Sequence, residues 1–148
     1  MNTRVLFWLG LLVSGCESLA PTPRREAFQP GRSTPPGIAL LFKSALDSGR
    51  IADALTLLGT PEGVPLPAAE RYELLPELER LQNLLAGLPI TALRIDTLAP
   101  GSAAVWLEVD YLHTLHFLLH RRDSLWLIIA LERLPWRRPA VPVFPPPE

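Results

Sequence analysis

The first half of the folded part of the chain repeats its apolar positions with the period of an α-helix. Residues 38–49 place apolar side chains three and four positions apart and end in a glycine, which predicts a first helix. Residues 51–58 predict a second, shorter helix. Residues 67–87 begin with a proline, which suits the first turn of a helix, and carry leucines along one side. Pro76 lies inside this third helix and is expected to kink or restart it.

After Pro89 the apolar positions alternate with polar ones, which is the period of a β-strand. The alternation is present in residues 91–98, 103–111 and 114–120, and residues 125–131 are an almost entirely apolar run. The sequences Pro-Gly-Ser and Arg-Arg-Asp-Ser lie between two pairs of these segments and are typical of turns. The pattern predicts an α+β fold, in which N-terminal helices pack on a curved antiparallel sheet of about four strands.

The last third of the chain also fits a helical pattern. Tyr111, Leu112, Leu115, Leu118 and Leu119 form a stripe with helical spacing, and leucine favours helices. Short apolar runs are hard to assign by period alone. An all-α helical bundle is therefore the alternative fold.

Residues 1–15 have the layout of a signal peptide: a polar start with one positive charge, nine mostly apolar residues and two small residues. The apolar run is too short to span a bilayer, which takes about 20 residues in a helix. The junction Val13-Ser14-Gly15-Cys16 resembles the lipobox of bacterial lipoproteins, and Cys16 is the only cysteine in the chain. The resemblance implies cleavage between Gly15 and Cys16, with diacylglycerol on the Cys16 thiol and an acyl chain on the new amino terminus.

A chain that carries several acyl groups is held stably at a membrane surface. The resemblance therefore implies a lipoprotein of the cell envelope that faces the periplasm. Glu17 follows the cysteine, where an aspartate is the usual signal for the inner membrane, so the outer membrane is favoured. No cofactor is expected other than the covalent lipid.

Prolines are concentrated at both ends of the remaining chain. Residues 16–37 are interpreted as a Pro-rich tether and residues 135–148 as a Pro-rich tail, which leaves residues 38–134 as one domain. Loss of residues 1–15 removes one arginine and no acid from 14 basic and 15 acidic residues, so the formal charge becomes −2. This charge is not the basic footprint that binding to nucleic acid requires.

The domain resembles small NTF2-like proteins, which have a cystatin-like α+β fold. The segment FKSALDSGRIADALTLL resembles their opening pair of helices, and LHFLLHRRDSLWLIIALERL resembles their closing hairpin, although its turn lacks the usual glycine. The resemblance implies a cone in which a curved sheet wraps a helix, often around a pocket. Proteins of this fold serve as enzymes, ligand binders or dimeric scaffolds.

Few residues are candidates for chemistry. His113, His116 and His120 would share one face of a helix, but on a strand His116 and His120 lie ~13 Å apart, too far for one metal ion, so no metal site is predicted. Asp96 and Asp110 are weak catalytic candidates together with His116, since some NTF2-like enzymes line their pocket with Asp and His. Their alternation with apolar residues is equally typical of a solvated sheet face.

Trp106 and Trp126 are candidates for a partner surface or a pocket wall. Trp106 lies among the polar residues of its strand, and the last strand is apolar on both faces. Such a strand is normally covered on both faces, by a partner, a second copy or the Pro-rich tail. If the helices cover the face that carries Trp106, it is instead a core residue.

These features favour a lipid-anchored envelope module without enzymatic activity. The module would bind an envelope protein, a second copy of itself or a small apolar ligand. An NTF2-like enzyme with a pocket lined by Asp and His is the alternative.

Overall fold

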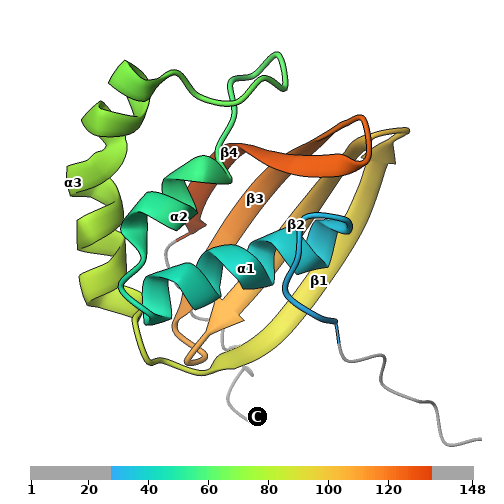
Figure 1. The fold of residues 1–148 in the computed structure, drawn as a ribbon. Coiled ribbons are helices and arrows are strands. Elements are labelled where there is room, and N and C mark those ends of the chain that lie inside the picture. Colours follow the sequence, from blue (N-terminus) through green and yellow to red (C-terminus); the bar gives the residue numbers. More distant parts are fainter. Residues whose placement is uncertain (1–27, 135–148) are drawn as a thin grey trace, which may run out of the picture.

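The computed structural model describes residues 28–134, and residues 1–27 and 135–148 lie outside it. Three helices precede four strands along the chain (Figure 1). The elements are α1 (Pro35–Asp47), α2 (Ile51–Thr56), α3 (Ala68–Leu85), β1 (Ile90–Ala99), β2 (Ser102–Val109), β3 (His113–Arg122) and β4 (Leu125–Leu134). None of these helices is both long enough and apolar enough to cross a membrane.

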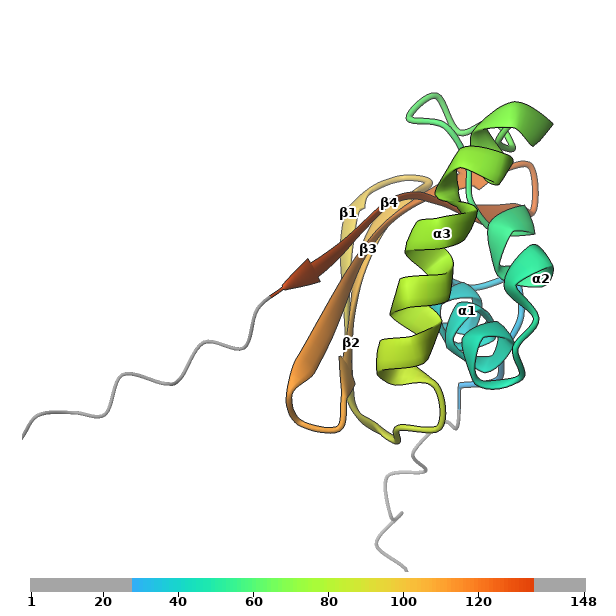
Figure 2. The ribbon, with the colours of Figure 1, turned by 90° about the vertical axis from the view of Figure 1, so that its left-hand side faces the viewer.

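The predicted α+β fold is confirmed, and the all-α bundle is excluded. The strands form one open antiparallel sheet in the order β1-β2-β3-β4. Figure 2 shows the three helices on one side of this curved sheet, and no helix of the described chain lies on the other side. We call these sides the inner and the outer face. The arrangement is consistent with an NTF2-like cone.

The two hairpins at the end of the chain turn without glycine. Asp110 and Tyr111 have φ of 54° and 59°, and the N–H of Leu112 donates to the carbonyl of Val109 at 3.2 Å. Positive φ at both central residues is the geometry of a type I′ turn, which matches the twist of the flanking strands. Asp123 has φ 55° in the next hairpin. The predicted Arg-Arg-Asp-Ser turn is therefore shorter than expected, because both arginines belong to β3.

The third helix is a single continuous element. It runs through Pro76 without a restart, from Ala68 to Leu85. Only Leu78 and Leu85 of this helix are fully buried. The leucine stripe of α3 is therefore only partly covered by the rest of the domain.

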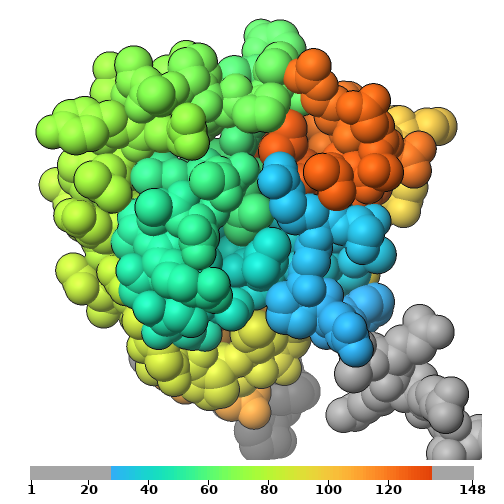
Figure 3. Space-filling view, viewed as in Figure 1, coloured from blue at the N-terminus to red at the C-terminus, as the bar shows by residue number. Residues whose placement is uncertain are grey.

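The folded domain begins before the predicted boundary at residue 38. Helix α1 starts at Pro35, and the Thr34 hydroxyl caps it by accepting the N–H of Gly37 at 3.1 Å. The carbonyl of Arg32 accepts the N–H of Trp126 at 2.8 Å, so this segment runs along the edge of β4. In Figure 3 the blue start of the described chain lies against the β3–β4 hairpin. The end of the predicted tether therefore belongs to the domain.

A β-bulge interrupts the alternation in β4. The register of β3 and β4 shifts between Leu118 and Leu119, so that Ile129 has no partner residue on β3. Trp126, Leu127 and Ile128 are consecutively buried before this shift. The backbone of Ile128 also bonds with Leu57 and Gly59, which follow α2. The bulge explains why β4 is apolar without a regular period.

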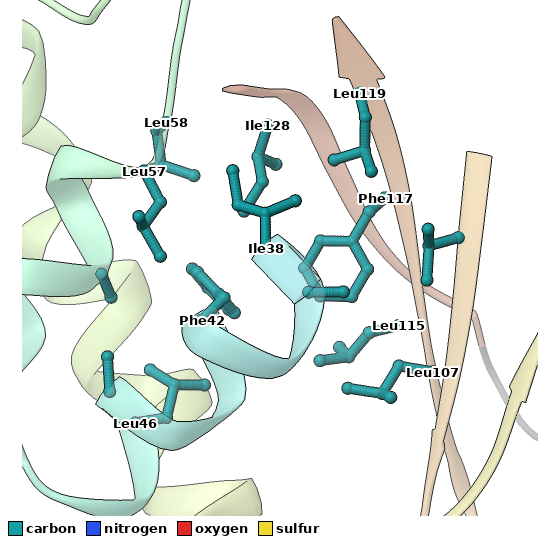
Figure 4. Packing of buried hydrophobic residues seen from close by; sticks show 14 of the residues in the cluster. Ile38, Phe42, Leu46, Leu57, Leu58, Leu107, Leu115, Phe117, Leu119 and Ile128 are labelled. Atoms are coloured by element: carbon teal, nitrogen blue, oxygen red, sulfur yellow. The ribbon is translucent and has the colours of Figure 1, made fainter. Parts of the chain in front are cut away.

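The core lies between α1 and the inner face of the sheet (Figure 4). At its centre the rings of Phe42 and Phe117 meet edge to face, with centroids 5.6 Å apart and planes at 77°. Edge-to-face pairs stabilise a core beyond the area that they bury.

One charged group is buried at the end of α1. The side chain of Lys43 is 2% exposed, pairs with Asp47 and donates to the carbonyl of Leu88 at 2.9 Å. Asp47 also accepts the N–H of Gly87 at 2.9 Å. The pair therefore ties the end of α1 to the connection between α3 and β1.

Candidate functional site

The described chain contains an apolar pocket between α3 and β4, with a volume of about 260 Å³. We call it the α3–β4 pocket. Its walls come from α3, from both ends of the loop between α2 and α3, and from the strands β3 and β4. Its lining is Leu58, Gly59, Leu66, Leu74, Glu77, Leu78, Leu81, Leu115, Ile128, Ile129, Ala130, Leu131 and Arg133.

The pocket follows from the way in which two elements pack. Helix α1 occupies the centre of the inner face, and α3 stands at the side of the sheet that carries β4 (Figure 1). Because few residues of α3 are fully buried, its leucines leave space beneath the helix. The bulge places Ile129 in the wall of that space. Bulges often re-aim side chains beside functional sites.

Two charged side chains belong to the lining. The carboxylate of Glu77 lies 3.2 Å from the guanidinium of Arg80, one turn further along α3. Arg133 is the position of β4 opposite Leu115, and this row of the inner face continues with Leu107 and Leu93. Arg133 therefore projects a cation from the inner face at the end of an apolar row. Within residues 28–134 its guanidinium forms no ion pair.

The catalytic candidates are not brought together. Asp96 lies opposite Ala104 in the register of β1 and β2. Asp110 follows Ala104 by six residues, which is ~20 Å along the strand at 3.3 Å per residue. Asp110 therefore lies far from Asp96, the partner of Ala104. Asp96 lies 4.0 Å from Arg94, and His116 contacts neither aspartate by an ion pair. Within the described chain, these three side chains do not form the Asp/His pocket that the enzyme alternative requires.

The histidines lie on strand β3 as predicted. His113 pairs with the inner-facing Val109, whereas His116 and His120 pair with Trp106 and Ser102 on the outer face. No group of three or more His, Cys, Asp or Glu side chains in residues 28–134 is arranged to hold a metal ion.

The outer face carries one row of polar and aromatic side chains that crosses all four strands. Arg94, Trp106, His116 and Glu132 lie directly opposite one another in register. The Arg94 guanidinium lies 4.0 Å from the centre of the Trp106 ring, which stacks on the His116 ring with centroids 4.7 Å apart. His116 Nδ1 lies 3.8 Å from Glu132, and its buried Nε2 has no hydrogen-bond partner in the described chain. We call these four residues the outer row.

The two tryptophans have different environments. Trp106 is half-buried on the outer face, where a partner surface was expected. Trp126 is 8% exposed and belongs to the core cluster. The bulge in β4 accounts for this difference from the simple alternation.

The sequence does not locate the pocket, because a row of leucines along one side of a helix does not show whether another element covers it. One signal bears on it, an arginine at the end of the last apolar strand, whose inward position is shown by the register of β3 and β4. Cys16 and Gly15 of the lipobox, and the Pro-rich tail, lie outside the described residues.

Comparison with known families finds no family model that matches the chain. No curated protein sequence matches it either.

Proposed function

We propose that the chain is a lipid-anchored module of the cell envelope that binds a small apolar ligand in the α3–β4 pocket, without enzymatic activity. The observation that carries the binding function is the pocket itself, whose walls are almost entirely leucine, isoleucine and alanine. Concave apolar sites with a few charged groups at the mouth are typical of ligand sites. The lipobox resemblance supports the anchor, and Glu17 supports the outer membrane.

Replacement of Cys16 with serine is expected to abolish lipid attachment completely, because the hydroxyl does not replace the thiol that receives diacylglycerol. Intact-mass measurement of the membrane fraction checks this. The wild-type chain should begin at Cys16 with the mass of its acyl groups, and the variant should keep its signal peptide. A wild-type amino terminus at any other residue would contradict the lipoprotein proposal.

Replacement of Leu74 with tryptophan is expected to lower ligand binding at least fivefold, because the larger side chain fills the mouth of the pocket. Leu74 is 39% exposed, so the change does not disturb the core. The measurement is photolabelling of the full-length lipidated chain, in phospholipid nanodiscs, with a diazirine-bearing decyl alcohol, followed by peptide mass spectrometry.

Leu84 provides a matched control, since it lies on the same helix, is also 39% exposed and does not line the pocket. Leu84→Trp should leave labelling unchanged. Equal labelling of peptides from α3 and β4 in both variants and in the wild type would show that the pocket does not bind the probe.

The outer row favours a second candidate function, the docking of an envelope protein or a second copy of the chain. It is an aromatic stack on the sheet face that carries no helix of the described chain. Aromatic and arginine side chains are enriched where protein partners dock.

A photo-crosslinking amino acid placed at Trp106 is expected to give a discrete crosslinked product in intact membranes. Tyr72, which is 77% exposed on α3, is the control position on the opposite side of the domain. Product from both positions, or from neither, would contradict a docking surface at the outer row. A product of twice the mass of the chain would identify a second copy.

A further inference from the structure

Resting on the proposed apolar-ligand function, we infer that the α3–β4 pocket takes a medium-chain fatty acid, whose carboxylate lies at the Arg133 guanidinium. Three properties of the pocket carry this inference: its volume, the composition of its walls and the charge at its mouth.

The volume limits the ligand to one short chain. A methylene group has a volume similar to that of a water molecule in the liquid, which is ~30 Å³. A pocket of about 260 Å³ therefore holds one aliphatic chain of about eight carbons. This is below the usual range of about 300–1,000 Å³ for drug-sized ligands. A two-chain phospholipid or a polycyclic ligand does not fit this volume.

The walls provide no specific polar recognition along the chain of the ligand. The lining includes Leu78, Leu81 and Leu115 as well as Ile128 and Leu131. A ligand that binds against such walls removes its methylene groups from water. Each buried methylene raises the affinity about fourfold. An unbranched aliphatic chain is the ligand that obtains this gain without leaving a buried polar group unpaired.

The mouth selects an anionic head group. Of the two charged residues in the lining, Glu77 is paired with Arg80, and Arg133 has no carboxylate within 4.0 Å among the described residues. Arg133 also lies on the inner face, in a row whose other three members are leucines. A guanidinium binds a carboxylate with two parallel hydrogen bonds, so a fatty acid satisfies the cation and the walls together.

The test compares two photoreactive probes that differ only in the head group, a diazirine-bearing decanoate and the matching decanol. Each is added to the full-length lipidated chain in phosphatidylcholine nanodiscs, and labelling of peptides from α3 and β4 is quantified. Labelling by each probe is divided by the amount of that probe in the nanodiscs, which corrects for its partition into the bilayer. Unlabelled hexanoate and octanoate serve as competitors.

In the wild type, decanoate should label the pocket at least fivefold more than decanol, and octanoate should compete better than hexanoate. Arg133→Gln should lower labelling by decanoate about fivefold and leave labelling by decanol unchanged. Arg133→Lys should retain most of the preference, and Arg122→Gln, at an exposed position of β3 outside the pocket, should have no effect. Circular dichroism of each variant checks that the fold is intact.

Two failures are distinguishable. If decanol labels the pocket as strongly as decanoate, and Arg133→Gln changes neither, the fatty acid inference is overturned while the apolar-ligand function stands. If neither probe labels the pocket above the level of Leu74→Trp, both are overturned. Should Leu74→Trp fail to fold, Leu74→Phe replaces it as the reference.

Discussion

Replacement of Phe117 with alanine is expected to lower the free energy of unfolding by about 4 kcal/mol, since large-to-small changes of a core phenylalanine typically cost about 3–5 kcal/mol. Phe117 is fully buried on the inner face, and the substitution removes both its buried ring and the edge-to-face contact with Phe42. Small domains are stable by only about 5–15 kcal/mol, so this variant should be close to unfolding at 37 °C. Urea denaturation of the chain from Glu17 onward, without lipid, measures the effect.

Leu118 is the control for this experiment, because it is the next residue of β3 and lies half-buried on the outer face. Leu118→Ala should cost only about 1 kcal/mol, because less apolar surface is exposed by the change. Similar costs at both positions would contradict the assignment of the inner face as the core.

Replacement of Asp47 with alanine is expected to destabilise the domain by about 3 kcal/mol, because it leaves the buried Lys43 ammonium with no opposite charge. Lys43→Met should cost less, about 1–2 kcal/mol, because the methionine fills the space of the aliphatic stem, and the Asp47 carboxylate that loses its partner is partly exposed to water and keeps the N–H of Gly87. The asymmetry follows from exposure, which is 38% for the Asp47 side chain and 2% for that of Lys43.

The double variant, Lys43→Met with Asp47→Ala, should be more stable than Asp47→Ala alone, since no charge is then left in the core. Urea denaturation of the four proteins completes this cycle. A greater loss from Lys43→Met than from Asp47→Ala would show that the ammonium is not the desolvated partner.

The order and the type of the elements follow from local patterns, which is why they could be predicted. Ile38, Leu41 and Phe42 fall on one side of a helix, and Val105, Leu107 and Val109 fall on one face of a strand. Such patterns depend only on neighbours in the chain. The last two hairpins have Asp110, Tyr111 and Asp123 where glycine is usual, because aspartate tolerates the left-handed region and tyrosine is held there by the hairpin.

The candidate site depends on packing between distant segments, which no local period reports. The bulge at Ile129 turns Trp126 toward the core and places Ile129 in the wall of the pocket. In the sequence, this segment is one continuous apolar run with no sign of a bulge. Arg133 and Leu74 come together only because α3 stands beside β4. In the same way, Arg94, Trp106 and His116 are spread over three strands and form a stack only in the register of the sheet.

The most direct test of the binding proposal is a methyl-detected NMR titration of the lipid-free chain from Glu17 onward with octanoate. Intermolecular nuclear Overhauser effects should connect the octanoate chain to the methyl groups of Leu78, Leu81 and Ile129, and chemical shifts should saturate at one ligand per chain. Leu74→Trp should remove these effects. Octanoate contacts confined to methyl groups outside the α3–β4 pocket, or shifts that never saturate, would contradict the account.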